Sequence, residues 1–333
     1  MMRMMRAWTT AAILGSALVV AGPAASAEKV VFQFGWLPGG DRAAYYLASH
    51  VGLFAAEGLD VQLLPGKGST DALTKIATGV ADMGEGGLDA LLTAKVQNEI
   101  PVTAVMAIYT KAPDALVTTT ASGIKTLRDV TGKTVATSPF TSSNGPWPFL
   151  LRMNGVDPAT VNLIKADPGA LGPMLATGRV DAVIQYVTNA PATATILQEA
   201  KKTIHMIPWA DYGLTGYSSS IFVSHKMLAT RRDTVVRFTR ALKKAEQMMR
   251  EDPDKAATAL KAIVPEVDVS IAKALVLSTL PLIFNENTQR DGLGVFSPDI
   301  VKTTWEWVAK QQDVSLDKLD PMSSVDLRIA TVQ

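Results

Sequence analysis

The sequence predicts an α/β protein of two similar lobes, each built on a mostly parallel sheet flanked by helices. Short apolar runs alternate with amphipathic segments, and turns rich in glycine separate them. This alternation is typical of βαβ units, whose strands run parallel. The sequence ATGVAD at residues 77–82 returns as ATGRVD at residues 176–181, in each case where a helix ends and a strand starts. An echo in the same structural context favours two related lobes.

The composition limits the class of protein. The 333 residues are 47% apolar and 19% charged, which is enough for two ordinary domains. A net charge of +1 gives no electrostatic reason to expect nucleic acid or an acidic partner. The lack of cysteine excludes disulfides, zinc–thiolate sites and thiol catalysis. The three histidines have no metal-binding spacing, and no nucleotide-binding or hydrolase motif is present, so we expect no metal, cofactor or catalytic residue.

The first 27 residues have the pattern of a secretion signal. Arg3 and Arg6 precede an apolar run at residues 11–21, and the sequence ASA at residues 25–27 matches a small-x-small cleavage site. We therefore expect cleavage after Ala27, an alternative being that the segment stays as an uncleaved anchor. The apolar run is too short to span a bilayer, and no cysteine at the cleavage site is available for a lipid anchor. These features predict a soluble, exported monomer in the periplasm.

Four strands are expected in the first lobe, at residues 30–34, 61–64, 81–83 and 102–108. Asp41 is placed to cap the helix after the first strand, and Ser69 or Thr70 to cap the helix after the second. Gly79 suits the left-handed position that ends this second helix.

Glycine-rich turns are expected after two of these strands, at residues 65–68 and at residues 84–87 (GEGG), where a helix follows. Both turns would open at the same edge of a parallel sheet, which is where ligands bind in open α/β sheets. Backbone N–H groups at helix starts also favour electron-rich groups there. The alternative is that these glycines only make tight connections.

A second series begins near residue 116. Its strands are expected at residues 132–137, 161–165, 180–186 and 204–209, and its helices at residues 146–153, at residues 170–177 and from residues 187–191 onward. An alternating run at residues 217–223 is expected to return to the first lobe, followed by helices at residues 233–250, 254–264, 270–280 and 298–311. The expected division is a signal peptide (1–27), the first part of lobe one (28–116), lobe two (117–219), and a segment (220–333) that completes lobe one with C-terminal helices.

Several segments resemble the solute-binding proteins of ABC importers, in particular the sulfonate/nitrate/taurine and thiamine-pyrimidine binders, a family related to the pyrimidine synthases. They are GWLP at residues 35–38, GLFAAEGLDV at 52–61, GVADMG at 79–84, LRDVTGKTV at 127–135 and GRVDAV at 178–183. The second of these is the most specific. The resemblance implies the type II periplasmic-binding-protein fold, with two crossing hinge strands. It also implies capture of a small ligand by hinge closure and delivery to an ABC permease in the inner membrane, without catalysis.

The resemblance places ligand contacts in the turns that follow the strands. The candidate residues are Trp36, Asp41, Lys67, Ser69, Glu85, Gly86 and Tyr109 in lobe one, and Ser138, Ser142, Asn144, Tyr186, Asn189 and Asp211 in lobe two. The central expectation is that the two sets face each other across a gap, with Trp36 on one wall and Asn189 on the other.

The chemistry of three candidate types points to different ligands. Trp36 lies beside glycines rather than on an amphipathic face, which favours stacking on a ligand. Glu85 in a glycine-rich segment suits a ligand with N–H donors, such as a planar heterocycle resembling a pyrimidine. Arg42 and Lys67 could instead pair with an anion, or could be solvated surface charges.

Three alternatives therefore remain beside the leading hypothesis of a binding protein for a heterocyclic or aromatic compound. One is a binder of alkanesulfonate, taurine or nitrate. Another is an enzyme resembling the pyrimidine synthases, which the lack of cysteine and the export signal oppose. The last is a binding module that serves a membrane sensor rather than a permease.

Overall fold

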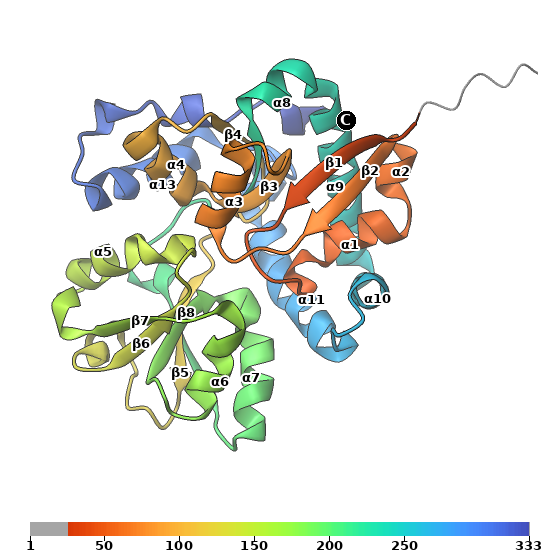
Figure 1. The fold of residues 1–333 in the computed structure, drawn as a ribbon. Helices are drawn as coiled ribbons and strands as arrows, with labels where there is room; N and C mark the ends of the chain where they lie inside the picture. The colour runs from red at the N-terminus through yellow and green to blue at the C-terminus, as the bar shows by residue number, and fades with distance from the viewer. Residues whose placement is uncertain (1–25, 333) are drawn as a thin grey trace, which may run out of the picture.

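The computed structural model describes residues 26–332, and these form two lobes with one five-stranded sheet each (Figure 1). The predicted secretion signal falls almost wholly on residues 1–25, outside the described residues. Within residues 26–332, none of the helices combines the length and the apolar character that crossing a membrane would need.

The sheet of lobe one has the strand order β2-β1-β3-β10-β4. Its strands are β1 (Glu28–Gln33), β2 (Leu59–Leu64), β3 (Met83–Gly87), β4 (Val102–Ala107) and β10 (Ser219–Ser224). β1 pairs in parallel with β2 and β3, whereas β10 runs antiparallel to both of its neighbours, β3 and β4. The predicted return of the chain to lobe one is thus confirmed, and it fills the position between β3 and β4.

The sheet of lobe two repeats this plan, with the order β7-β6-β8-β5-β9. Its strands are β5 (Asp114–Thr119), β6 (Thr134–Thr137), β7 (Asn162–Lys165), β8 (Ala182–Tyr186) and β9 (Ile204–Pro208). β6 is parallel to β7 and β8, and β5 is the antiparallel member. In both sheets the antiparallel strand is the one that the chain enters directly after crossing from the other lobe, so the predicted fold class is confirmed.

Helices cover both sheets (Figure 1). Lobe one has α1 (Ala43–His50), α2 (Leu53–Ala56), α3 (Ser69–Ala77), α4 (Leu88–Asn98), α8 (His225–Thr230), α9 (Arg232–Glu251), α10 (Pro253–Ile263), α11 (Val269–Ile283), α12 (Glu286–Asp291) and α13 (Pro298–Gln311). Lobe two has α5 (Pro146–Met153), α6 (Leu171–Ala176) and α7 (Ala190–Glu199). The C-terminal half packs on lobe one, where the rings of Phe32 and Phe238 stack with centroids 5.1 Å apart.

The sequence echo corresponds to one structural device used twice. Gly79 and Gly178 end their helices with φ of +78° and +72°. Asp82 then accepts a hydrogen bond from the N–H of Val31 at 2.8 Å, and Asp181 accepts one from the N–H of Thr134, also at 2.8 Å. Asp82 therefore ties the start of β3 to β1, and Asp181 ties the start of β8 to β6.

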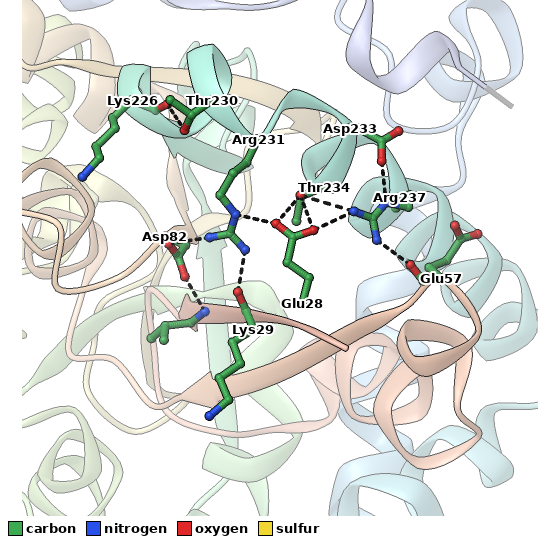
Figure 2. A network of polar contacts seen from close by, with 11 residues as sticks. Glu28, Lys29, Glu57, Asp82, Lys226, Thr230, Arg231, Asp233, Thr234 and Arg237 are labelled. Atoms are coloured by element: carbon green, nitrogen blue, oxygen red, sulfur yellow. Dashed lines mark hydrogen bonds and ion pairs between the residues drawn. The ribbon is translucent and has the colours of Figure 1, made fainter. Parts of the chain in front are cut away.

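A network of ion pairs joins the start of β1 to α9, far along the chain (Figure 2). Glu28 accepts hydrogen bonds from Arg231 Nε at 2.6 Å, from Arg237 Nη2 at 2.7 Å and from the hydroxyl of Thr234 at 2.7 Å. Burial opposes ionisation of Glu28, but these hydrogen bonds outweigh it and hold its pKa at about 2. The network fixes the first strand of the described chain to the C-terminal half.

Three local expectations were wrong. The segment GEGG at residues 84–87 is not a turn but most of β3, because it forms a ladder with β10. Its glycines allow close approach, since a Cβ at Gly86 would lie 2.9 Å from the ring of Phe222. Neither Asp41 nor Ser69 caps a helix through its side chain. Asp41 pairs with Arg42, and Ser69 accepts a hydrogen bond from the N–H of Gly87.

Candidate ligand-binding site

A cavity lies between the lobes, where the ends of β1 and β3 face the end of β8. It encloses about 420 Å³ of empty space, part of which is open to solvent. Lobe one, including its strand β10, contributes Gly35, Trp36, Arg42, Ser69, Glu85, Gly86, Gly87 and Ser219. Lobe two contributes Thr141, Gln185, Tyr186 and Asn189. We call this space the inner cavity. Trp36 and Asn189 both line it, from opposite lobes.

Three buried charged side chains lie at the lobe-one wall. The guanidinium of Arg42 pairs with the carboxylate of Asp41, and its Nη2 lies 3.0 Å from Oε1 of Glu85. Burial acts to lower the pKa of Arg42, but the two carboxylates outweigh it and the net shift is upward. With both carboxylates ionised, the group carries a net charge of −1, although the buried Nε of Arg42 has no hydrogen-bond partner among the described residues.

Of the two carboxylate oxygens of Glu85, one accepts hydrogen bonds and the other has no partner among the described residues. The hydroxyl of Ser219 donates to Oε1 at 2.5 Å, beside the bond from Arg42. Among the described residues Oε2 has no hydrogen-bond partner, although the side chain is 3% exposed. A buried carboxylate oxygen without a donor is costly, and this atom is free to accept a hydrogen bond.

Aromatic side chains line or support the cavity. Trp36 comes from lobe one but packs against the apolar cluster of lobe two that includes Leu171 and Val183. The rings of Tyr109 and Tyr186 meet edge to face with centroids 6.5 Å apart. The hydroxyl of Tyr186 shares hydrogen bonds with Ser142 at 2.9 Å and with Ser218 at 3.1 Å. An aromatic ligand would therefore meet a ring from each lobe.

The lobes touch along a seam beside the cavity. The N–H of Thr70 donates to the carbonyl of Phe140 at 3.1 Å, and the hydroxyl of Ser138 donates to the carbonyl of Lys67 at 3.1 Å. Gly68 lies so close to lobe two that a Cβ there would be 2.0 Å from the carbonyl oxygen of Phe140. The structure therefore holds the two lobes in contact.

Two further carboxyl groups are buried near Tyr186. Burial, together with the nearby Asp114, raises the pKa of Asp89 to about 7. Burial also raises the pKa of Asp114 to about 6, although the hydroxyl of Ser143 donates to its Oδ1 at 2.5 Å and opposes the shift. Asp89 comes from α4 of lobe one and Asp114 from β5 of lobe two. Within the described chain, no cluster of three or more acidic, histidine or cysteine side chains could hold a metal ion.

The candidate residues from the sequence divide into two groups. Those that line the inner cavity are Trp36, Ser69, Glu85, Gly86, Tyr186 and Asn189. Those that do not are Asp41, Lys67, Tyr109, Ser138, Ser142, Asn144 and Asp211.

Each member of the second group has a different structural setting. Asp41 and Tyr109 lie behind the cavity wall, where the hydroxyl of Tyr109 donates to the carbonyl of Asp41 at 3.3 Å. Lys67 has an exposed side chain, and it meets Ser138 at the seam through its carbonyl. Asp211 is also exposed, in the short helix after β9.

Ser142 and Asn144 line a neighbouring groove at the seam. The side-chain amide of Asn144 donates to the carbonyl of Ser138 at 2.8 Å, so its polar atoms serve the loop itself.

The sequence reasoning did not include some of the lining residues among its candidates, namely Gly35, Arg42, Gly87, Thr141, Gln185 and Ser219. Arg42 was predicted to be either a partner for an anion or a solvated surface charge, and its side chain is instead buried. A usable signal existed for Gln185, a polar residue near the end of an otherwise apolar strand. Its amide nitrogen donates to the hydroxyl of Thr193 at 2.8 Å, which fixes its orientation.

Comparison with known families and proteins gives consistent results. The profile of a family described as NMT1/THI5 like matches residues 40–256. A putative thiamine biosynthesis protein of Haemophilus influenzae is 26% identical over 82% of this chain and 86% of its own. The riboflavin-binding protein RibY of Chloroflexus aurantiacus is 26% identical over 88% and 85%, and the formylaminopyrimidine-binding protein of Halalkalibacterium halodurans is 23% identical over 80% and 79%.

Solved structures share the fold. A protein of Bordetella bronchiseptica superposes with a TM-score of 0.76 and 19% identity over 91% of this chain and 96% of its own. The alkanesulfonate-binding protein SsuA of Xanthomonas axonopodis pv. citri, bound to MOPS, superposes with a TM-score of 0.69 and 14% identity over 91% and 99%. At these identities the likeness shows the fold alone.

Proposed function

The chain belongs to the NMT1/THI5-like family, and on that premise we propose that it is the substrate-binding component of an ABC importer, which captures a small planar nitrogen heterocycle. Two relatives carry names that state such a ligand, riboflavin in one and a formylaminopyrimidine in the other. The proposal places the protein in the periplasm, beside a permease that receives the ligand.

The observation that carries the proposal is the state of Glu85 in the inner cavity. Its Oε2 is buried and lacks a donor among the described residues, so a ring N–H or amino group of the ligand would supply one. Trp36, at the same cavity, offers a face on which a planar ring stacks. A carboxylate beside an aromatic wall suits an aminopyrimidine-like edge.

The same wall argues against a sulfonate, taurine or nitrate. The cation of Arg42 is already paired with two carboxylates, Asp41 and Glu85, and the side chain of Lys67 is exposed away from the inner cavity. The Nε of Arg42 is left without a partner among the described residues, but an anion that accepted its hydrogen bond would lie beside the carboxylates of Asp41 and Glu85, which would repel it. The charge of the cavity therefore favours the heterocycle over the anion.

The arrangement of candidate contacts on both lobes supports capture of a ligand rather than catalysis. The candidate ligand contacts come from both lobes, with Glu85 on one side and Gln185 and Asn189 on the other. A ligand that bonds both lobes stabilises their closed arrangement, because those bonds are complete only when the lobes meet. The enzymatic alternative would need its own reactive group, and cysteine is absent from the sequence.

A thermal-shift and calorimetric panel tests the proposal. Aminopyrimidines, flavins and alkanesulfonates are each added to the purified protein. A cognate heterocycle at a hundred times its Kd should stabilise the fold by about 2.7 kcal/mol. Trp36→Ala should abolish the ligand-induced shift, which is measured against the variant's own ligand-free melting temperature because Trp36 also packs on lobe two. Asp211→Asn, an exposed control, should keep the shift. Binding of a sulfonate with no binding of any heterocycle would refute the proposal.

Transport is tested separately in cells. Deletion of the gene should abolish uptake of the heterocycle at low concentration, and the wild-type gene should restore it while Trp36→Ala does not. Unchanged uptake with loss of a transcriptional response would instead favour the role in a membrane sensor.

A further inference from the structure

A second hollow adjoins the inner cavity on the other side of Trp36. It has about 910 Å³ of empty space and is more open. Its lining comes from residues 36–41 and α11 of lobe one and from residues 168–172, β8 and α7 of lobe two. We call it the outer groove. Trp36, Gln185 and Asn189 line both spaces, so a ligand that touches these three side chains can extend from one space into the other.

The charge of the outer groove is restricted to two carboxylates. Of the described residues that line it, only Asp41 and Asp268 are ionisable, and no lysine, arginine or histidine is among them. Asp41 is paired with Arg42. Asp268 caps α11, because its Oδ1 accepts hydrogen bonds from the N–H groups of Ser270 at 2.8 Å and Ile271 at 3.0 Å. The groove thus has no cation for an anionic group.

The remaining lining is mostly apolar. The larger apolar side chains are Leu37, Pro38, Pro168, Ile196, Val267, Ile271 and Leu275. The polar hydroxyl of Thr193 already accepts the hydrogen bond from Gln185. The start of α7 offers few free N–H groups, since Pro191 has none and the N–H of Ala190 bonds to Val187. These features suit a hydrocarbon group rather than a phosphate or a carboxylate.

We propose that the ligand has two parts, a planar heterocycle in the inner cavity and an uncharged, apolar substituent of a few carbons that lies in the outer groove. This inference rests on the proposed function and specifies its ligand class. Trp36 lies where the two parts join, and Glu85 contacts only the ring. The substituent gains affinity by leaving water, about fourfold for each CH₂ that is fully buried.

The competing interpretation is that the outer groove is only the entrance to the inner cavity. An entrance is indifferent to what the ligand carries, so it predicts equal affinity for a bare ring and for a ring with a chain. The two interpretations therefore differ in a measurable ratio of affinities.

Three matched probes measure this ratio by calorimetry. They are 4-amino-2-methylpyrimidine, its 5-butyl derivative and its 5-(3-carboxypropyl) derivative. We expect the butyl compound to bind at least tenfold more tightly than the bare ring, with one molecule per chain. The carboxypropyl compound should bind no better than the bare ring, because its anion meets two carboxylates and no cation.

A groove-filling variant localises the effect. A Cβ at Gly169 would have no heavy atom within 4 Å, so Gly169→Trp can fill the outer groove without displacing the fold. It should abolish the gain from the butyl chain and change affinity for the bare ring less than twofold. Gly169→Ala, which leaves the groove open, should keep the gain. Ala192→Phe approaches the same space from α7 and provides an independent variant.

The outcomes separate the two proposals. If the bare ring binds and Glu85→Gln weakens it, but the butyl chain adds nothing, the proposed function stands and the two-part ligand is refuted. A gain that survives both groove-filling variants, a tighter carboxypropyl compound, or two molecules bound per chain also refutes it. If none of the three probes binds, the two-part ligand is refuted, and if no heterocycle of the wider panel binds either, the proposed function fails as well.

Discussion

Arg42 links ligand selectivity to the stability of lobe one. Its side chain is 4% exposed and compensates two carboxylates, those of Asp41 and Glu85. The replacement of a buried cation leaves its partners as uncompensated buried charges, which costs more than the pair itself contributes.

We therefore expect Arg42→Met to lower the free energy of unfolding by about 3–5 kcal/mol, measured by denaturant titration. The double variant Arg42→Met/Glu85→Gln removes one of the stranded charges and should recover part of this loss. A loss below about 1 kcal/mol in the single variant would contradict the buried ion-pair arrangement.

Asp89 should make stability fall as the pH rises. Its pKa is about 7 in the folded chain against an ordinary value of 3.8, so between these values the folded state holds a proton that the unfolded state has released. Stability is therefore unaffected below pH 3.8, declines from there to about pH 7, and stays reduced above it.

Asp89→Asn should remove the part of the decline that Asp89 causes, a gain of roughly 4 kcal/mol at pH 8, since each pKa unit is worth about 1.4 kcal/mol. A smaller decline should remain, because the pKa of Asp114 is also raised, to about 6. Thermal melts between pH 4 and pH 8 measure the slope, and Asp211→Asn serves as the exposed control. A wild-type curve that rises across this range would show that Asp89 is not held protonated.

At the residue scale, the sequence could predict the parts of the site that lie in turns. Trp36 and Asn189 were predicted to lie in turns that follow strands, and the structure brings both residues to one cavity. Gln185 had a signal as a polar residue near the end of an apolar strand, whereas Ser219 could not be found in this way, because it lies within β10 and reaches the cavity from a strand. The assignment of all these residues to ligand binding stays a prediction.

At the scale of secondary-structure elements, contact between the two lobes depends on the seam between residues 65–68 and 138–141. Gly68 has a φ of +155° and its α-carbon faces the backbone of Phe140, so the lobes can meet only because it has no side chain.

Gly68→Ala should hold the lobes apart and weaken ligand binding at least tenfold. X-ray scattering should show no compaction on addition of ligand, unlike the wild type. Gly79→Ala is the matched control, because Gly79 also has positive φ but a Cβ there would meet nothing within 4 Å. Normal compaction of the Gly68→Ala protein would refute the role of this contact.

Most elements were predictable because their apolar periodicity and end signals agree. The helices α5 and α13 were predicted with the bounds that the structure has, and the strand β6 begins two residues later than predicted. β3 was not, because four residues rich in glycine have the composition of a turn. Its strand conformation is imposed by the ladder with β10, a segment more than a hundred residues away.

At the scale of the whole molecule, the two sheets differ in whether their strands are consecutive in the sequence. The sheet of lobe two uses strands from Asp114 to Pro208 without interruption. The sheet of lobe one needs β10, which follows all of lobe two, and its first strand is tied to α9 through Glu28. That tie was not predictable from the sequence, since Glu28 and Arg231 are 203 positions apart.

This difference predicts that fragments of the two lobes differ in their ability to fold alone. A fragment of residues 110–215 contains the whole sheet of lobe two and should unfold cooperatively, as followed by circular dichroism. A fragment of residues 28–110 lacks the strand between β3 and β4 and should remain unfolded. Cooperative unfolding of the second fragment alone would reverse the inferred dependence.

The late position of β10 has a consequence for biosynthesis. A ribosome that has released the first four strands has not yet made the strand that joins β3 to β4, nor the arginines that hold Glu28. The leading part of the nascent chain therefore cannot complete its lobe during early synthesis. For a protein proposed to work beyond the inner membrane, this delay keeps the N-terminal strands unfolded, as passage across the membrane requires, while translocation begins.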